Sequence, residues 1–252
     1  MEDVLLLIDI GNTSTTLGLY RAGAVVRRAG AVHPSDPVQQ LRDFCQEARV
    51  RAAAVCSVVP RLTGDWTEAI SAEFALDPLV VHHTLDLGIP VTYPRPETIG
   101  PDRLANAVGA SIRHGRPVVV ADFGTGLTFD IVSETEGYIG GVIAPGLPLM
   151  FDYLAEKTAL LPRIGPESVT SAIGKSTEHA MRAGAQIGYR GMVKEILAAL
   201  RAELRVPGLT VCATGGYAEW VMREVDPTFK VEPDLTLFGI AAIHLRNRTD
   251  FS

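Results

Sequence analysis

The chain has 252 residues, of which 47% are hydrophobic and 21% charged, and its formal net charge is −6. A chain of this length and composition can bury a sizeable core, as one large domain or as two of ordinary size. The acidic balance argues against a nucleic-acid partner, because phosphate backbones attract clustered lysine and arginine.

The amino terminus and the cysteines predict a cytoplasmic protein. A secretory signal begins with basic residues, whereas the first residues here, Met1-Glu2-Asp3, are acidic. No apolar run approaches the ~20 residues that a membrane helix needs, so no membrane partner is expected. The three cysteines, Cys45, Cys56 and Cys212, show no pairing pattern and no zinc-type spacing, which predicts reduced thiols.

The first predicted element is a strand, a tight turn and a second strand over residues 5–19. Its apolar run ends in Asp9, and Gly11 opens a turn where backbone can approach a ligand closely. A carboxylate at a strand end can hold a cation or its waters beside phosphate oxygens. Short donors surround this turn, namely Asn12, Thr13, Ser14 and Thr15. An ordinary hairpin is the alternative interpretation.

Between residues 24 and 82 the pattern alternates between strands and helices, which indicates an α/β architecture. We expect a strand from Ala24 to Arg28, helices over 38–47 and up to Phe74, and further strands over 52–59 and 78–82. Thr63 or Asp65 is the expected cap of the second helix. His82-His83 lacks metal-ligand spacing, since neighbours on a strand point to opposite faces.

The stretch from Tyr93 to Ala107 carries the strongest chemical signal. Gly100-Pro101 forms a turn, and Asp102 falls where a helix begins. Asp102 could be a structural cap or first-turn charge, and Arg103 a surface ion-pair partner. In the functional interpretation, Asp102 accepts a proton from a substrate hydroxyl and Arg103 binds a carboxylate or phosphate.

The first pattern occurs again in the second half of the chain. The apolar run from Val118 ends in Asp122, and Gly124 follows. Thr128 lies as many residues after Asp122 as Thr15 lies after Asp9. This equal spacing indicates a duplicated domain. If the halves face each other, two acidic turns converge on one cleft that can hold a polyphosphate and its cation.

The remaining elements are a mostly helical stretch over 168–204, a strand over 211–213 and a last helix over 235–244. The last helix is expected to pack on the second domain. The glycines of Thr214-Gly215-Gly216 either leave space for the adenosine of a nucleotide or form a simple turn. A stripe of small residues after Thr177 predicts close helix packing, within the subunit or across a dimer: Met181, Gly184, Ala185 and Gly188. In the internal case Thr177 is merely a helix cap.

An ordered set of motifs closely resembles the type III pantothenate kinase family, from about residue 4 to Gly239. The paired acidic turns also resemble the wider actin-like, sugar-kinase and chaperone ATPase superfamily. The motifs are Asp9-Ile10-Gly11-Asn12-Thr13, Gly100-Pro101-Asp102-Arg103, Asp122-Phe123-Gly124-Thr125, Tyr138-Ile139-Gly140-Gly141, Ile173-Gly174-Lys175-Ser176-Thr177 and Ala213-Thr214-Gly215-Gly216.

The resemblance implies an α/β fold of the duplicated actin-like (ribonuclease H-like) kind. Two mixed β-sheets flanked by helices would enclose an interdomain cleft, with domains over 1–114 and 115–252. The implied activity is ATP-dependent phosphorylation of pantothenate to 4′-phosphopantothenate, the first step of coenzyme A biosynthesis. The implied assembly is a homodimer.

Family resemblance also implies the roles of individual residues. Asp102 would be the catalytic base, and Asp9 would hold Mg²⁺ through water. Asp122 would bind a monovalent cation, K⁺ or NH₄⁺. Substrate would contact Tyr93, Gly100, Pro101, Asp102, Arg103 and Thr177. ATP would contact Asp9, Ile10, Gly11, Asn12, Thr13, Ser14, Thr15, Thr16, Thr125, Gly215 and Gly216.

One departure from the family pattern and two rival functions stay open. Gly126-Leu127 replaces the usual Ala-Thr, and the lost hydroxyl could weaken nucleotide contacts. One rival is a non-catalytic nucleotide-binding regulatory factor of the same fold. The other is a kinase for another small hydroxylated substrate, such as a sugar or polyol.

Overall fold

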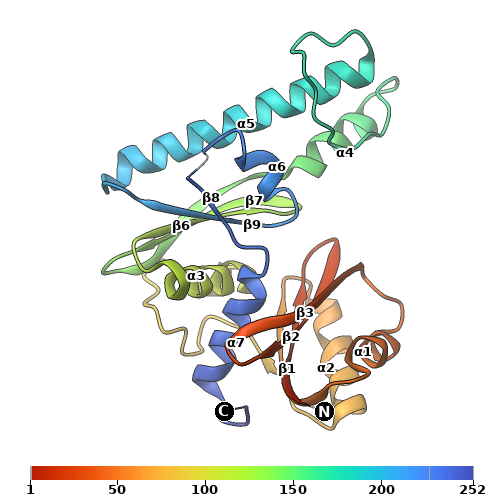
Figure 1. Ribbon diagram of the computed structural model, residues 1–252, viewed down its shortest axis with the longest axis vertical. Coiled ribbons are helices and arrows are strands. Elements are labelled where there is room, and N and C mark those ends of the chain that lie inside the picture. Colours follow the sequence, from red (N-terminus) through yellow and green to blue (C-terminus); the bar gives the residue numbers. More distant parts are fainter. Residues whose placement is uncertain (1, 227, 252) are drawn as a thin grey trace. The chain divides into compact units, whose positions relative to one another are not determined.

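The computed structural model describes residues 2–226 and 228–251, which divide into two units (Figure 1). Unit 1 consists of Met1–Arg116, Val132–Ile139 and Asp234–Ser252, and unit 2 of Pro117–Ile131 and Gly140–Pro233. The carboxyl-terminal segment thus belongs to the first unit, whereas the sequence suggested two continuous ranges.

Unit 1 is built on a five-stranded mixed sheet in the order β3-β2-β1-β4-β5. Strand β1 pairs antiparallel with β2 and parallel with β4. The strands are β1 (Asp3–Ile10), β2 (Ser14–Arg21), β3 (Ala24–Val32), β4 (Arg49–Ser57) and β5 (Leu79–Val80). The central strand β1 is buried from Val4 to Ile8, which explains its continuous apolar run.

Helices cover both faces of this sheet. They are α1 (Pro37–Cys45), α2 (Pro60–Phe74), α3 (Pro101–His114) and α7 (Leu235–Asn247), with a 3₁₀ turn at Pro96–Thr98. Leu6 and Ile8 of β1 join a core with Leu41 of α1 and Trp66 of α2. Side chains alternate along a strand, so Leu7 and Asp9 point to the other face.

The last helix, α7, packs on unit 1, so the expectation that it packs on the second domain was wrong. Gly239 of α7 lies so close to Ala105 of α3 that a side chain there would overlap the Ala105 backbone. A side chain on Gly18 of β2 would come within 2.9 Å of Leu237. Glycine therefore brings α7 against both α3 and the sheet, at positions that no sequence periodicity reveals.

Helix α2 begins earlier than the sequence predicted. Its first residue is Pro60, and Val59 precedes it without any side-chain cap. The expected caps, Thr63 and Asp65, lie inside the helix. Proline is favoured at a first helical position because its missing N–H has no partner there in any case.

Unit 2 repeats the sheet of unit 1. Its order is β10-β9-β6-β7-β8, so the central strand is again the first of its half. The strands are β6 (Val118–Phe123), β7 (Gly126–Ser133), β8 (Gly137–Pro145), β9 (Thr210–Thr214) and β10 (Lys230–Val231). The end of β7 and the start of β8, within Val132–Ile139, belong to unit 1. Counting outward from β1 and from β6 gives the same arrangement, which confirms the predicted duplication and two mixed sheets flanked by helices.

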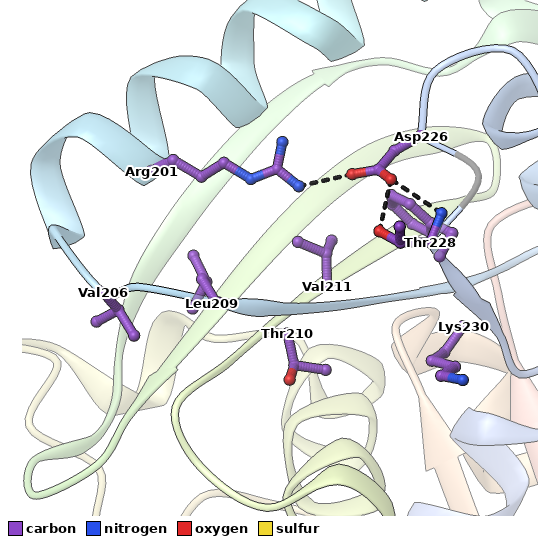
Figure 2. Close-up of a pocket in the computed structure, with 10 residues that line it drawn as sticks. Arg201, Val206, Leu209, Thr210, Val211, Asp226, Thr228 and Lys230 are labelled. Carbon is purple, nitrogen blue, oxygen red and sulfur yellow. Dashed lines mark hydrogen bonds and ion pairs between the residues drawn. The ribbon is translucent and has the colours of Figure 1, made fainter.

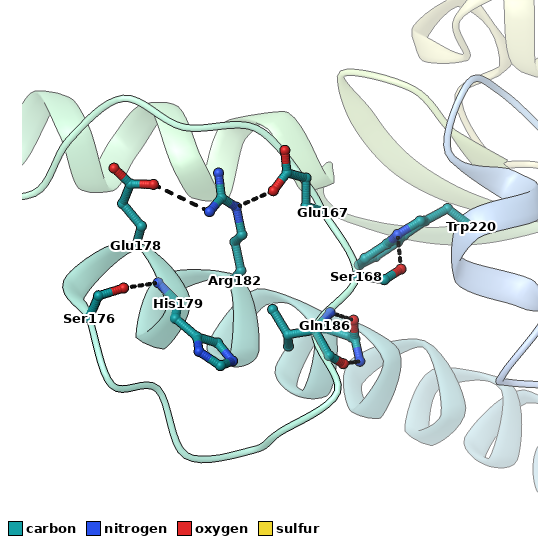
Figure 3. A network of polar contacts seen from close by, with 9 residues as sticks. Glu167, Ser168, Ser176, Glu178, His179, Arg182, Gln186 and Trp220 are labelled. Carbon is teal, nitrogen blue, oxygen red and sulfur yellow. Dashed lines mark hydrogen bonds and ion pairs between the residues drawn. The ribbon is translucent and has the colours of Figure 1, made fainter.

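The helices of unit 2 are α4 (Leu147–Lys157), α5 (Thr177–Leu204) and α6 (Ala218–Met222). Residues 168–176 were expected to be mostly helical but are irregular. Side chains hold this segment in place (Figure 3): Gln186 hydrogen-bonds both main-chain groups of Val169, and Trp220 donates to the Ser168 hydroxyl. Arg182 of α5 lies 3.3 Å from carboxylates of both Glu167 and Glu178.

Two sequence-based exclusions can be compared with the fold. Within residues 2–226 and 228–251, no helix has the length and apolarity to cross a membrane. Cys45, Cys56 and Cys212 are buried free thiols, as their spacing predicted.

Candidate active site

The first acidic turn is a tight β1–β2 hairpin, as predicted. Ile10 pairs with Thr15 across it, and the Gly11 N–H donates to the Ser14 carbonyl at 3.0 Å. The residues at its tip, Asn12 and Thr13, are exposed, together with Ser14 at the start of β2. The loop therefore presents short polar groups to the surroundings of unit 1.

Asp9 and Asp102 both lie near the buried thiol of Cys56. Parallel pairing of β1 and β4 places Cys56 beside Asp9 on the sheet face opposite to the Leu6–Ile8 core. Burial raises the pKa of the Cys56 thiol, and the negative charges of Asp9 and then Asp102 raise it further. The thiol therefore stays neutral between two carboxylates that are far apart in the sequence.

Asp102 lies in the first turn of α3 but does not cap it. The cap position is Gly100, which has no side chain to offer, and Pro101 is the first helical residue. The Arg103 N–H donates to Asp102 Oδ1 at 2.8 Å. Burial raises the pKa of Asp102, against the lowering effects of that bond and of the Arg103 charge. A carboxylate with a raised pKa is better matched to a general base than an exposed one.

Arg103 and Tyr93 both contact Tyr138. The Arg103 guanidinium carbon lies 5.9 Å from the centre of the Tyr138 ring. The Tyr93 ring meets Tyr138 edge to face, with centroids 6.2 Å apart. Main-chain bonds hold Tyr138 in place, since its N–H donates to Pro90 and its carbonyl accepts from Thr92. Unit 1 therefore brings Tyr93 and Arg103 together, as the prediction of one substrate site requires.

Tyr138 is a candidate functional residue that the sequence interpretation missed. It is fully buried and contacts Tyr93 and Arg103, two predicted substrate-binding residues. Its motif, Tyr138-Ile139-Gly140-Gly141, was noted only as part of the family pattern. Its neighbours come from segments some forty residues away, and no local pattern predicts such a contact.

The second acidic turn follows β6 in unit 2. Asp122 is half-buried and pairs in parallel register with Thr214 of β9, so Gly215 follows directly beside it. Gly215 has φ +91°, and a Cβ there would lie 2.6 Å from Asp122 Oδ1. Only glycine fits this close approach and this left-handed conformation. Gly216 is exposed, with no atom of the described residues within 4 Å of a built Cβ.

The loop after Asp122 is supported by the start of α4. The Gly146 N–H donates to the Thr125 carbonyl at 3.1 Å, and a side chain on Gly146 would overlap that carbonyl. Leu127 is fully buried. The side chain of Leu127, at the departure from the family pattern, is therefore part of the core.

Thr177 is the first residue of α5 in unit 2, whereas Tyr93 and Arg103 belong to unit 1. The cap of α5 is Ser176, whose hydroxyl accepts from the His179 N–H at 3.1 Å, so the alternative of Thr177 as cap was wrong (Figure 3). Thr177 is exposed beside a groove of about 450 Å³ between α4 and α5. The other lining residues are Met150, Leu154, Leu161, Ala180, Met181, Gly184 and Ala185.

A second cavity of about 400 Å³ in unit 2 contains none of the predicted site residues (Figure 2). It lies at the start of β9, where Arg201 pairs with Asp226 at 2.7 Å and Asp226 also accepts from Thr228. Ligands of parallel sheets bind at the carboxyl ends of strands, where Gly215 follows β9. The cavity is therefore at the wrong end of β9 for the candidate site.

The donor set fits a cation that is shared with a ligand rather than a metal held by protein alone. Among residues 2–226 and 228–251, no three Cys, His, Asp or Glu side chains gather as metal ligands. Mg²⁺ in phosphoryl-transfer enzymes is commonly held by one or two carboxylates, water and substrate phosphates. Asp9 and Asp122, each half-buried at the end of a central strand, match that requirement.

Two mixed sheets, each with an Asp-x-Gly sequence at the end of its central strand, form the duplicated actin-like fold. A family model described as type III pantothenate kinase matches residues 5–199. The chain belongs to the type III pantothenate kinase family.

Named relatives agree with this assignment, and a solved structure shares the fold. A type III pantothenate kinase from Akkermansia muciniphila is 45% identical over 240 residues, covering 93% of this chain and 96% of the relative. One from Thermomicrobium roseum is 36% identical over 253 residues, covering 96% and 97%. A crystal structure from Campylobacter jejuni, named for the Baf family of transcriptional activators, superposes with a TM-score of 0.64 at 18% identity, covering 96% and 98%. At that identity the similarity concerns the fold alone.

Proposed function

We propose that this chain transfers the γ-phosphoryl group of ATP to the primary hydroxyl of pantothenate, giving 4′-phosphopantothenate in the first step of coenzyme A biosynthesis. Membership of the family supports the reaction. The observation that carries it is the position of Asp9 and Asp102 near the end of β4, where Asp9 pairs with Cys56 and a Cβ on Gly100 would meet both Asp102 and Val58. The proposed phosphate turn and the proposed base therefore share one region of unit 1.

Asp102 is the proposed general base. Its carboxylate takes the proton of the pantothenate hydroxyl as the hydroxyl oxygen attacks the γ-phosphorus and ADP leaves. The Arg103 N–H bond to Oδ1 holds the carboxylate in place at the start of α3. The raised pKa makes Asp102 a stronger proton acceptor than an exposed aspartate.

The second requirement of the reaction is to stabilise the negative charge on the transferred phosphoryl group. Asn12 and Thr13 of the first turn, with Thr125 of the second, are the proposed donors to phosphate oxygens. The Gly11 N–H already binds Ser14, so Gly11 is the proposed point of close backbone approach to ATP. Asp9 is the proposed ligand of Mg²⁺ waters. Bound there, Mg²⁺ would neutralise negative charge on the phosphate oxygens.

Arg103 is the proposed anchor for the pantothenate carboxylate. Its planar guanidinium can bind a carboxylate through two parallel bonds, and the Tyr138 ring limits where it can lie. Tyr93, which packs on the same ring, is the proposed wall of the substrate site. Gly100 and Pro101 shape the turn that carries Asp102.

Asp122 is the proposed ligand of a monovalent cation, K⁺ or NH₄⁺, beside the ATP phosphates. Gly215 presses backbone against this carboxylate, and exposed Gly216 follows as the proposed adenosine contact.

A homodimer is proposed as the active form, with Thr177 near the partner's substrate site. Exposed apolar side chains on α4 and α5 support a partner surface: Leu149 is 42%, Tyr153 64% and Ile187 54% exposed.

A panel of small hydroxylated substrates with ATP tests this function. We expect ADP release with pantothenate and only background release with hexoses and polyols. Equal release with another alcohol would assign a different substrate. Nucleotide binding without turnover on any member of the panel would support a regulatory protein instead.

A further inference from the structure

His33 joins two residues of the first phosphate turn from outside the hairpin. It follows β3 directly and is half-buried. Its Nδ1 lies 3.1 Å from the hydroxyl oxygen of Thr15, and its Nε2 lies 3.2 Å from the carbonyl oxygen of Asn12. The imidazole ring therefore bridges the turn tip and the start of β2.

The chemistry of the Asn12 carbonyl fixes the direction of one of these bonds. A carbonyl oxygen can only accept, so Nε2–H of His33 donates to Asn12. Thr15 is fully buried, and its hydroxyl can donate to Nδ1 of the neutral ring. Neutral His33 with its proton on Nε2 satisfies both partners at once.

Holding the Asn12 carbonyl also sets the direction of an amide. The peptide group between Asn12 and Thr13 is planar and trans, so its C=O and N–H point in opposite directions. When His33 binds the carbonyl, the Thr13 N–H must point away from His33. The neck of the hairpin is closed by the Gly11–Ser14 main-chain bond.

We propose that His33 is a positioning residue for the first phosphate turn, which holds the Asn12–Thr13 peptide in the orientation that ATP binding uses. The inference rests on the proposed function of this turn as a phosphate site. His33 acts through the peptide and needs no contact with the nucleotide itself.

Three variants separate this role from a general structural one. His33→Ala removes both bonds, and His33→Asn has a shorter side chain that can keep the Thr15 bond while losing the one to Asn12. His82→Ala is the matched control, since the ring of exposed His82 bonds the hydroxyl of Thr84, two residues further along the chain. Each variant is assayed for kcat and for KM of ATP and of pantothenate. Each is also titrated calorimetrically with the non-hydrolysable analogue adenylyl imidodiphosphate and Mg²⁺.

We expect His33→Ala and His33→Asn to raise the KM of ATP and the Kd of the analogue about 10-fold or more, with the KM of pantothenate within about twofold. A purely structural loss would lower the active fraction without changing the KM of ATP. If His33→Ala does not fold, His33→Asn alone carries the test.

An unchanged Kd for the analogue in a folded His33 variant would overturn the proposal. Failure of the proposed function gives a different result. In that case the wild-type protein would not phosphorylate pantothenate, while weakened analogue binding by the His33 variants would still support the positioning role.

Discussion

The carboxylate of Asp102 occupies the space where a side chain on Gly100 would lie. A Cβ built on Gly100 would overlap Asp102 Oδ1, and Val58 closes the space from the other side at 3.6 Å. The backbone conformation of Gly100, φ −57° and ψ 134°, is open to any residue. Glycine is therefore needed here for the space that it leaves to the base, and not for its conformational freedom.

Gly100→Ala should reduce turnover because the methyl group displaces the Asp102 carboxylate. A shift of about 1 Å at a reacting group can cost about 100-fold in rate, and we expect a loss of that order. Steady-state kinetics with pantothenate and ATP measure it. The control is Gly64→Ala in α2, where a built Cβ meets no described atom within 4 Å. Full activity of Gly100→Ala would mean that the carboxylate can move without cost.

Asp102→Asn should reduce turnover by roughly 10²–10⁴-fold, the usual contribution of a general base. Asparagine has the same shape and can still accept the Arg103 N–H bond. The loss therefore reports the missing proton acceptor. Near-normal turnover would mean that Asp102 is not the general base and serves only as a charge in the first turn of α3.

The same variant gives a pH test of stability. Burial raises the pKa of Asp102, so the folded protein binds this proton more tightly than the unfolded chain. The Asp102 contribution to stability therefore falls as pH rises from the ordinary aspartate pKa, about 3.9, through the raised value. Asp102→Asn lacks this loss, so it should gain in Tm relative to wild type as pH rises above about 4. An unchanged Tm difference would contradict the burial of an ionised carboxylate.

The sequence predicted the two acidic turns because each is a local pattern. An apolar run, Asp9 and Gly11 lie within one hairpin, and Asp122 and Gly124 repeat them. The duplication could be read from equal spacing, and the sheet orders confirm it. Local patterns of this kind need no knowledge of the tertiary fold.

Contacts between distant segments could not be predicted in the same way. Nothing near Gly239 indicates that it meets the backbone of Ala105, so the last helix was assigned to the wrong unit. Tyr138 reaches Arg103, and His33 reaches Asn12, only once the sheet is formed. Such positions follow from packing, for which single-residue patterns carry no signal.

Arg103→Lys should raise the KM of pantothenate about 10-fold and change kcat less. Lysine keeps the positive charge but loses the planar fork that can bind a carboxylate through two bonds. The stacking of the guanidinium on Tyr138 is lost as well. Separate kcat and KM values distinguish this from a loss of catalysis. The control is Arg113→Lys, whose guanidinium stacks on Phe238 at 4.2 Å. A KM unchanged by Arg103→Lys would remove Arg103 from carboxylate binding.

Activity should require K⁺ or NH₄⁺ in addition to Mg²⁺. A carboxylate beside a polyphosphate is repelled unless positive charge lies between them. Asp122 is half-buried, so water screens this repulsion less than at an exposed carboxylate. Asp122→Ala should abolish most activity together with the monovalent-cation requirement. The assay compares K⁺, NH₄⁺ and Na⁺ salts at constant ionic strength. Full activity of the wild-type protein in Na⁺ alone would contradict a monovalent-cation role for Asp122.

The small-residue stripe on α5 divides into a buried part and an open part. Met181 and Ala185 are 8% and 5% exposed, so they pack within unit 2. Gly184 and Gly188 are exposed, and a Cβ built on either meets no described atom within 4 Å. A side chain that starts at Gly184 therefore has room at its Cβ in the isolated subunit, where it would enter the groove between α4 and α5.

Gly184→Leu should consequently give a folded but inactive monomer. Replacing an exposed glycine inside a helix favours the helix by roughly 0.5–1 kcal/mol, so no loss of secondary structure is expected. Light scattering should report about one chain mass, 27.0 kDa, where the wild-type protein gives twice that value. Gly64→Leu on α2, also exposed and open, controls for the substitution itself. Because Thr177 lies at the start of the same helix, loss of the dimer should abolish pantothenate turnover while the Kd of an ATP analogue stays within about threefold. A Gly184→Leu dimer with full activity would place the partner surface elsewhere, and an active wild-type monomer would exclude a shared substrate site.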